Sequence, residues 1–202
     1  IGFYNDLAYI VVNGGDKIEV VNRYSMQKVA TISSGLNSPR YITFINGKGY
    51  VTCWGEESIP SDDYVAVVNL SNNGIITSIP VVEGPEKLVE KNGTLYVSHH
   101  GGWGYGSKLS IINTASNTVS STISVGDVPV DMEILGNFLW VLCEGKSSYS
   151  GNETGGKLQK INLTNNAVEE TFTFTTTSHP RNLNMYNDAL YYSLGDTSIY
   201  KM

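Results

Sequence analysis

The stretch "LYVSHHGG" at residues 95–102 has four counterparts elsewhere in the chain. They are "AYIVVNGG" (8–15), "GYVTCWGE" (49–56), "LWVLCEGK" (139–146) and "LYYSLGDT" (190–197). Each has an aromatic residue at its second position, and these are Tyr9, Tyr50, Tyr96, Trp140 and Tyr191. A proline stands 11 positions before the aromatic in the last four copies. The aromatics lie 41 to 51 residues apart, a period that is typical of propeller blades and of helical solenoids.

The pattern within each unit decides between these two architectures. In the second unit, turn residues such as "NGK" and "SNNG" separate expected strands at about 40–45, 49–54, 64–69 and 75–81. Apolar and polar residues alternate, and no segment keeps a helical period for three turns. We therefore expect an all-β fold, a β-propeller of four-stranded antiparallel blades. We expect residues 1–202 to form one domain. Its blades would span about 1–38, 39–84, 85–128, 129–179 and 180–202, and the last would be incomplete.

These motifs also resemble a known family. The spacing "P-x10-Y-V-x-x-x-G", with a terminal "VVN" or "IIN", resembles the YVTN-type β-propeller repeat of surface and secreted proteins. More closely, "GYVTCWG", "SGLNSPRYI", "LWVLCEG" and "LYYSLGDTSIYKM" resemble outer-surface propeller lipoproteins of Gram-negative anaerobes. The resemblance covers the whole chain. It implies a ring of about seven blades, a lipid anchor at the outer membrane and a place beside nutrient-uptake systems; some relatives capture corrinoids such as vitamin B12.

The chain holds about four and a half to five repeats. The family's first and last blades have no counterpart here, so we expect a fragment of a roughly seven-bladed ring. A five-bladed ring with one incomplete blade is the alternative.

Composition excludes several classes of partner. Charged residues are 16% of the chain and the net charge is −6, with no run of lysine and arginine. Nucleic acids and anionic membrane surfaces attract basic patches, so neither is an expected partner. No apolar stretch of about 18 residues is present, so we expect no transmembrane segment. The partners that remain are a small-molecule or glycan ligand, or a surface transporter protein.

One loop of the repeat varies in length while the rest is constant. From the aromatic to the asparagine that closes the third strand there are 13, 19, 17 and 22 positions in the first four units. The added residues fall between the second and third strands, on the face that also carries the proline loops. Elaborated loops on a rigid scaffold are common binding sites, and exposed aromatics beside polar groups suit a sugar or a flat ring. The expected ligand-binding residues are Trp54, Trp103, Tyr105, Tyr149, Arg40, Arg181, His100 and Glu144.

A zinc site is a weaker interpretation of the same loops. His99 and His100 are adjacent on a strand, so their side chains point to opposite faces. His99 shares its repeat position with Cys53 and Cys143, but equivalent positions of neighbouring blades lie about 10 Å apart, too far to share one ion. Because the two cysteines are in blades that are not neighbours, we expect both to be reduced and buried.

Other chemical motifs fail in their context. "GNETGGK" at 151–157 has phosphate-loop spacing but leads into a strand instead of a helix. Another loop carries the acidic residues Glu56, Glu57, Asp62 and Asp63. Because they lack EF-hand spacing, we expect these side chains to be solvated instead of binding calcium. We therefore expect no metal, no cofactor and no catalytic residue.

The sequence favours a non-catalytic cell-surface or secreted β-propeller that binds a small ligand, a glycan or corrinoid-like nutrient, at the elaborated face. One alternative is a protein-interaction scaffold of a surface uptake complex that uses the same face. A second is a lactonase-like hydrolase, which would need histidine, arginine and acidic groups converging on the ring axis.

Overall fold

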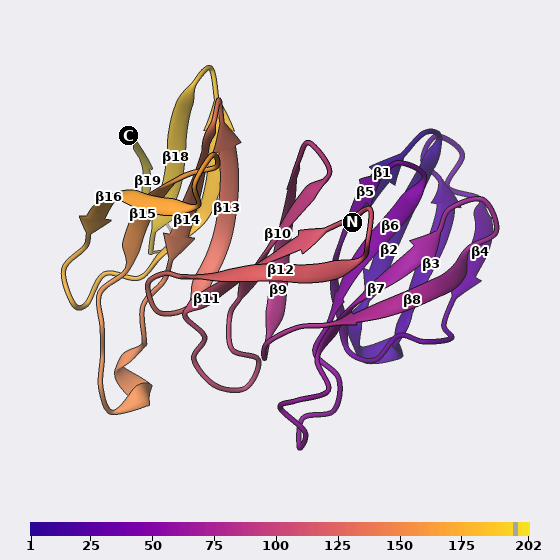
Figure 1. The fold of residues 1–202 in the computed structure, drawn as a ribbon, viewed down its shortest axis with the longest axis horizontal. Coiled ribbons are helices and arrows are strands. Elements are labelled where there is room, and N and C mark those ends of the chain that lie inside the picture. The colour runs from indigo at the N-terminus through magenta and orange to yellow at the C-terminus, as the bar shows by residue number, and fades with distance from the viewer. Residues whose placement is uncertain (196–197) are drawn as a thin grey trace.

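The computed structural model describes residues 1–195 and 198–202. Five antiparallel sheets stand side by side in an arc (Figure 1). The strands are β1 (Gly2–Tyr4), β2 (Leu7–Val12), β3 (Lys17–Asn22) and β4 (Lys28–Ile32); β5 (Pro39–Ile45), β6 (Lys48–Cys53), β7 (Tyr64–Asn69) and β8 (Gly74–Pro80); β9 (Pro85–Lys91), β10 (Thr94–His99), β11 (Lys108–Asn113) and β12 (Thr118–Ser124); β13 (Pro129–Leu135), β14 (Phe138–Cys143), β15 (Lys157–Asn162) and β16 (Ala167–Thr173); β17 (Pro180–Tyr186), β18 (Ala189–Leu194) and β19 (Ser198–Lys201).

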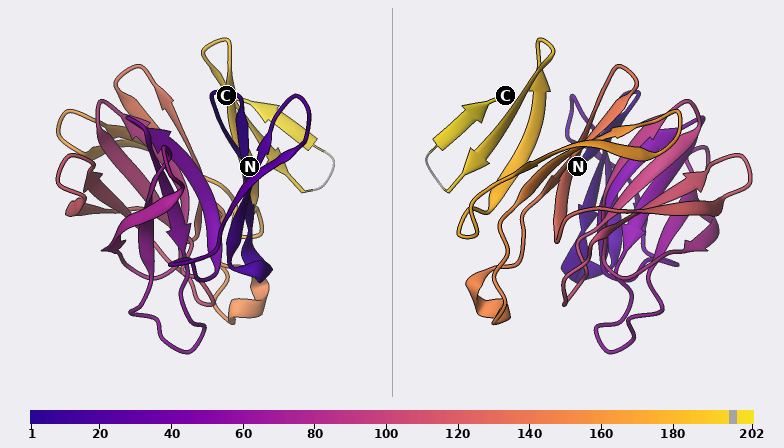
Figure 2. Two further views of the ribbon diagram at one scale, coloured as in Figure 1. Left: turned by 90° about the vertical axis from the view of Figure 1, so that its right-hand side faces the viewer. Right: turned by 60° about the vertical axis from the view of Figure 1, so that its left-hand side comes forward.

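Each sheet is built from consecutive strands, four in each of the first four sheets and three in the last. The first strands of neighbouring sheets contact one another, β5 with β9, β9 with β13 and β13 with β17, so they line the inner side of the arc (Figure 2). Within the described residues, the helical segments are two single turns, η1 (Asn13–Gly15) and η2 (Ser148–Ser150). These are β-propeller blades, and the all-β prediction is confirmed.

The repeated aromatics of the first four sheets are packed against the following sheet. Tyr9, Tyr50 and Tyr96 are each at most 4% exposed. The Tyr50 hydroxyl donates to the Thr114 carbonyl of the next sheet at 3.3 Å and contacts Asn117 Oδ1 at 3.0 Å. Burial raises the pKa of Tyr50. The fixed aromatic position therefore joins one blade to the next.

The recurring asparagines are explained by turns. The residue four positions before each aromatic has a left-handed φ between 48° and 59° at the first hairpin, and these residues are Asn5, Asn46, Asn92, Gly136 and Asn187. Asparagine and glycine adopt this conformation at the lowest cost. The asparagines that close the third strands accept backbone N–H groups two residues later, as Asn69 Oδ1 does from Ser71 at 2.9 Å.

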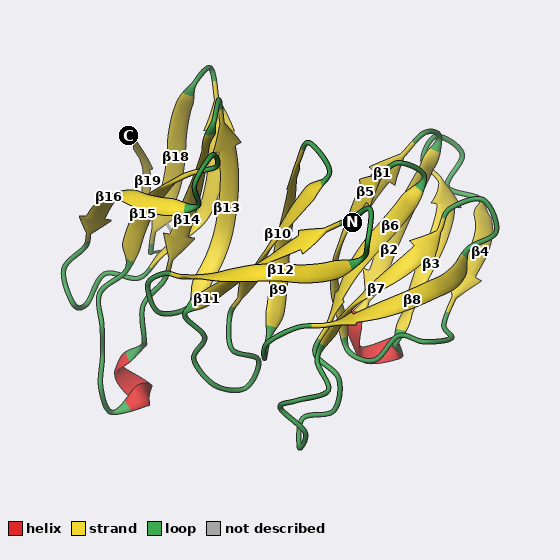
Figure 3. Ribbon diagram, viewed as in Figure 1, coloured by secondary structure: helices red, strands yellow, loops and turns green. Residues whose placement is uncertain are grey.

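The enlarged loops lie on one edge of the arc, opposite the first hairpins. They join β6 to β7, β10 to β11 and β14 to β15, and extend downward in Figure 3. Backbone hydrogen bonds tie them to the loops between sheets, for example from Gly156 N to Ser178 O at 2.9 Å. The prediction that the enlarged loops share a face with the proline loops is confirmed.

Both cysteines are buried and free of disulfides, as expected. Burial raises the pKa of Cys53 to about 11 and that of Cys143 to about 12. Among the residues that the structure describes, no helix has the length and apolarity needed to cross a membrane.

Candidate ligand-binding site

A β-bulge follows the proline of each inner strand from β5 onward. The strand register shifts after Pro39, Pro129 and Arg181, and opposite Val97–His99 in the β9–β10 pair. A bulge changes the direction of the side chains beside it and recurs next to binding sites. In β9, β13 and β17 both residues that follow the proline consequently line one cavity at the inner side of the arc.

Hydroxyl groups of the second strands hold the bulged backbone. The N–H of Tyr41 donates to Thr52 Oγ1 at 3.1 Å, and the N–H of Lys87 donates to Ser98 Oγ at 3.1 Å. The Thr52 hydroxyl also donates to the Glu86 carbonyl of the next blade at 2.8 Å. These bonds satisfy backbone groups that the bulge removes from the ladder, so the bulge is a fixed part of the fold.

A second repeated contact positions one loop residue in each of three blades. The carbonyl of the residue before each proline accepts the N–H of the first residue after the second strand. The pairs are Trp54 to Ser38 at 3.2 Å, His100 to Gly84 at 2.8 Å and Glu144 to Val128 at 2.8 Å. Ser38, Gly84 and Val128 adopt left-handed φ values of 48°, 68° and 56°, which turn these carbonyls toward the loops. Trp54, His100 and Glu144 are therefore equivalent residues of successive blades.

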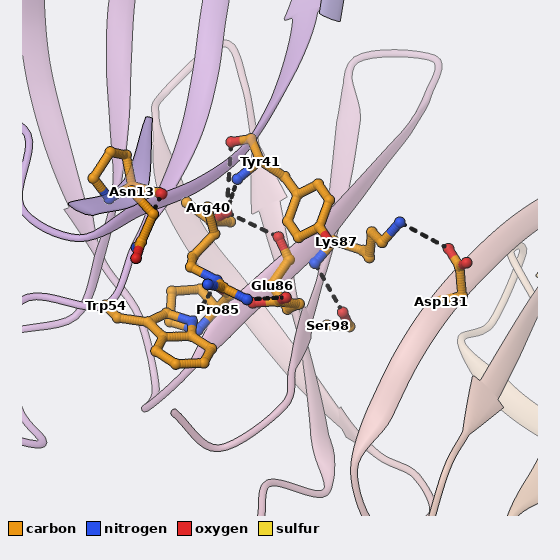
Figure 4. A network of polar contacts seen from close by, with 11 residues as sticks. Asn13, Arg40, Tyr41, Trp54, Pro85, Glu86, Lys87, Ser98 and Asp131 are labelled. Carbon is orange, nitrogen blue, oxygen red and sulfur yellow. Dashed lines mark hydrogen bonds and ion pairs between the residues drawn. The ribbon is translucent and has the colours of Figure 1, made fainter. Parts of the chain in front are cut away.

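Trp54 packs against residues of three segments, and Figure 4 shows it beside Arg40 and Pro85. Its indole N–H donates to the Pro85 carbonyl at 2.9 Å, and the guanidinium carbon of Arg40 lies 4.2 Å from its ring centroid. The His100 ring is stacked at 6.0 Å, and the Trp103 ring meets Trp54 edge-on at 5.9 Å. Trp54 is thus half-buried among its neighbours, whereas Trp103 is 65% exposed.

Ion pairs connect neighbouring inner strands. Arg40 of β5 forms a bidentate pair with the buried Glu86 of β9, with N–O distances of 2.9 and 2.8 Å. Lys87 of β9 lies 3.6 Å from an Asp131 carboxylate oxygen of β13 and 4.5 Å from the Tyr41 ring centroid. Burial raises the pKa of Asp131, against the opposing effect of the Lys87 ammonium. Figure 4 shows these residues in a row across three blades.

A third pair joins the fourth and fifth blades. Arg181 Nε donates to Glu144 Oε1 at 2.8 Å, and a second guanidinium nitrogen contacts the same oxygen. His179 lies beside this pair, with Nδ1 3.0 Å from the Glu144 carbonyl oxygen and Nε2 3.0 Å from Glu153 Oε1. The Tyr149 side chain is 98% exposed at the tip of the adjacent loop.

Two cavities adjoin at the Glu144–Arg181 pair, since both residues line both cavities. The central cavity, about 320 Å³, is lined by Tyr41, Glu86, Lys87, His100, Val130, Asp131, Glu144, Arg181 and Asn182. The lateral cavity, about 350 Å³, is lined by Glu144, Ser147, Ser148, Tyr149, Glu153, His179, Arg181, Ser193 and Gly195. These volumes are at the lower end of the range for small-ligand sites, roughly 300–1,000 Å³.

The predicted site residues fall into three places instead of one shared concavity. His100, Glu144 and Arg181 line the central cavity and Tyr149 lines the lateral one. Arg40 and Trp103 pack on Trp54, whose ring stacks on His100. Tyr105 lies apart, in a cavity of about 230 Å³ that is also lined by His99.

Apart from Arg181, sequence reasoning missed the cavity residues on the inner strands, which are Tyr41, Glu86, Lys87, Val130, Asp131 and Asn182. These residues could have been located from the repeated proline, because each follows that proline by one or two positions. A comparison of these positions across the repeats would have found them.

The acidic residues of the β6–β7 loop hold the backbone. Asp62 accepts the N–H of Glu56 at 3.0 Å, and the buried Asp63 accepts the N–H of Gly84 at 2.6 Å. Burial raises the pKa of Asp63 to about 6. In the described part of the chain, no group of three or more histidine, cysteine or acidic side chains could hold a metal ion.

No protein-family model matches the chain, and no curated protein matches it. Solved structures match in fold. Kuenenia stuttgartiensis hydrazine synthase is 18% identical with a TM-score of 0.78, over 93% of this chain and 52% of that one. BamB from Moraxella catarrhalis is 11% identical with a TM-score of 0.69, over 100% of this chain and 55% of that one. The dihydro-heme d1 dehydrogenase NirN is 13% identical with a TM-score of 0.63, over 87% of this chain and 37% of that one.

The chain thus spans about half the length or less of these neighbours. They include enzymes, hydrazine synthase and NirN, as well as BamB, so the likeness carries no activity over to this chain. What it shows is the fold: the chain is a β-propeller.

Proposed function

We propose that this chain is part of a non-catalytic β-propeller that binds a small ligand at the face with the enlarged loops. The observation that carries the proposal is the pair of adjoining cavities at the inner side of the arc. Their walls come from successive blades and are held by repeated hydrogen bonds, so the site is formed before any ligand arrives. Preorganised, mixed polar and aromatic walls are typical of small-ligand sites.

The resemblance to outer-surface lipoproteins supports a location at the cell surface or outside the cell. It also supports a nutrient as the ligand, either a glycan or a corrinoid-like molecule. A hydrolytic role is less well supported, because the groups that would act on a substrate already bind one another. His179 is held through both ring nitrogens, and Glu144 is paired with Arg181.

A protein-interaction scaffold is the second candidate, and the loop tips favour it. Trp103 and Tyr105 of the β10–β11 loop and Tyr149 of the β14–β15 loop are 65%, 48% and 98% exposed. Aromatic side chains of this kind anchor protein partners as well as sugars. The partner would be a surface transporter protein of an uptake complex.

A thermal-shift screen of glycans and corrinoids tests the proposal, followed by calorimetry with the best ligand. Tyr149→Ala should weaken binding about tenfold or more, because an aromatic contact is worth roughly 1.5–3 kcal/mol. Lys48→Ala, on the opposite face, should bind as the wild type does. If the ligand still binds Tyr149→Ala but no longer binds Lys48→Ala, the binding site lies on the opposite face and the proposal is wrong.

A further inference from the structure

Every charged side chain that lines the central cavity already has a partner of opposite charge. Glu86 is paired with Arg40, Lys87 with Asp131 and Arg181 with Glu144. Each pair joins two neighbouring blades, so the pairs are built into the packing of the arc. The wall of this cavity is rich in charged atoms but carries no uncompensated charge among the described residues.

This arrangement selects against charged ligands. Each lysine or arginine that could bind an anion lies beside a carboxylate that repels the anion, and each carboxylate that could bind a cation lies beside a positive group. The wall therefore offers a charged ligand little net attraction to repay the cost of removing its charge from water. An uncharged ligand avoids that cost.

Hydroxyl groups fit such a wall particularly well. A carboxylate in an ion pair keeps lone pairs that accept further hydrogen bonds, and lysine and arginine keep N–H groups that donate. A ligand hydroxyl can donate a hydrogen bond to the carboxylate and accept one from the lysine or arginine at the same time. The rings of Tyr41 and His100 add flat surface to the same cavity. Hydroxyls around the edge of a ring, with a C–H face that packs on aromatic surface, are the chemistry of a sugar.

The two cavities suggest the ligand's length. The central and lateral cavities meet at Glu144 and Arg181, and the exposed Tyr149 borders the lateral cavity. A ligand with one repeating unit in each cavity would cross this ion pair. On the basis of the proposed function, we infer that the ligand is an uncharged oligosaccharide of at least two sugar units.

A calorimetric panel tests the charge and the length of the ligand. Neutral cello-, malto-, xylo- and manno-oligosaccharides of one to four units are compared with oligogalacturonides as anions, chitosan oligomers as cations, and cyanocobalamin. We expect a neutral series to bind, with a gain of about tenfold from one unit to two and little change between 50 and 500 mM salt. Charged oligomers should bind at least about tenfold more weakly.

Variants that remove one charge of the Glu144–Arg181 pair test the reason for that selection. Glu144→Gln leaves Arg181 without its partner and should improve oligogalacturonide binding about fivefold while weakening the neutral ligand. Arg181→Gln should shift the preference toward chitosan oligomers by a similar factor. The matched control is Glu170→Gln, which breaks the Lys160–Glu170 pair on the outer strands β15 and β16 and should change nothing. Circular dichroism confirms that each variant is folded.

The outcomes separate the inference from the function on which it rests. Tighter binding of a charged oligomer or of cyanocobalamin by the wild type, with loss in Tyr149→Ala, overturns the inference and keeps the binding face. Equal responses of Glu144→Gln and Glu170→Gln overturn the role of the ion pairs. No binding of any probe overturns both the proposed function and the inference.

Discussion

Replacing His99 by cysteine should make the protein less sensitive to acid. His99 is 1% exposed, its Nε2 lies 2.8 Å from Ser110 Oγ, and its Nδ1 is buried without a hydrogen-bond partner in the described chain. Burial lowers the pKa of His99 to about 4. Cysteine is the natural replacement, because Cys53 and Cys143 occupy the same position in the neighbouring repeats.

The magnitude follows from the protons bound in the two states. At pH 7.5 His99 is neutral whether the chain is folded or unfolded. At pH 4.5 the unfolded side chain, with a pKa of about 6.5, is protonated, while the folded one is largely neutral. The unfolded state then binds more protons, so stability falls as the pH drops from about 6.5 toward about 4. Between pH 7.5 and 4.5 this group should cost about 2.5 kcal/mol.

Urea unfolding at both pH values measures the effect in the wild type and in His99→Cys. The variant should lose about 2.5 kcal/mol less stability on acidification, whatever its stability at pH 7.5, because the other groups cancel in the comparison. Ser110→Ala keeps the imidazole and should retain the acid sensitivity of the wild type. Equal acid sensitivity of His99→Cys and the wild type would refute the burial argument.

Three further predictions concern stability and reactivity. Asp63→Asn should have the opposite effect to His99→Cys. Because the pKa of Asp63 is raised to about 6, its contribution to stability falls by about 2 kcal/mol as the pH rises from 4.5 to 7.5. Urea unfolding of the variant at the two pH values should lack that fall. Cys53 and Cys143 should resist a thiol reagent at pH 8 in the native protein and react within minutes in urea; fast native labelling would contradict their burial. Gly84→Ala should lower the free energy of unfolding by more than about 2 kcal/mol, because a Cβ would lie 1.9 Å from Gly102 N, whereas Gly14→Ala, which meets nothing within 4 Å, is the control and should change it by less than about 0.5 kcal/mol.

The repeat made the fold predictable. The expected strands of the second unit agree with β5 to β8 within one residue at each end, because turns and alternation are local properties of the sequence. The aromatics of the first four repeats pack between blades because each meets the following sheet, whereas Tyr191 of the last sheet lines an open pocket. Even the asparagines of the hairpins follow from local backbone preference.

The site was only partly predictable, because its contacts cross between blades. Trp54 looked like an open stacking surface from its place in a loop, yet Arg40, His100 and Trp103 surround it. Tyr105 lies in the same enlarged loop as Trp103, yet Trp103 packs on Trp54 and Tyr105 lines a separate cavity with His99. Which loop side chains meet depends on how one sheet is rotated against the next, and no single repeat contains that information.

The sequence by itself determined the blade, its strands and the face that carries the elaborated loops, since each depends on residues close together in the chain. The tertiary structure alone decided the charge of the site. Arg40 and Glu86, Lys87 and Asp131, and Glu144 and Arg181 are 46, 44 and 37 positions apart, and each pair meets only where two neighbouring blades pack together. In the sequence these six residues are isolated charges, and in the folded chain they form three ion pairs.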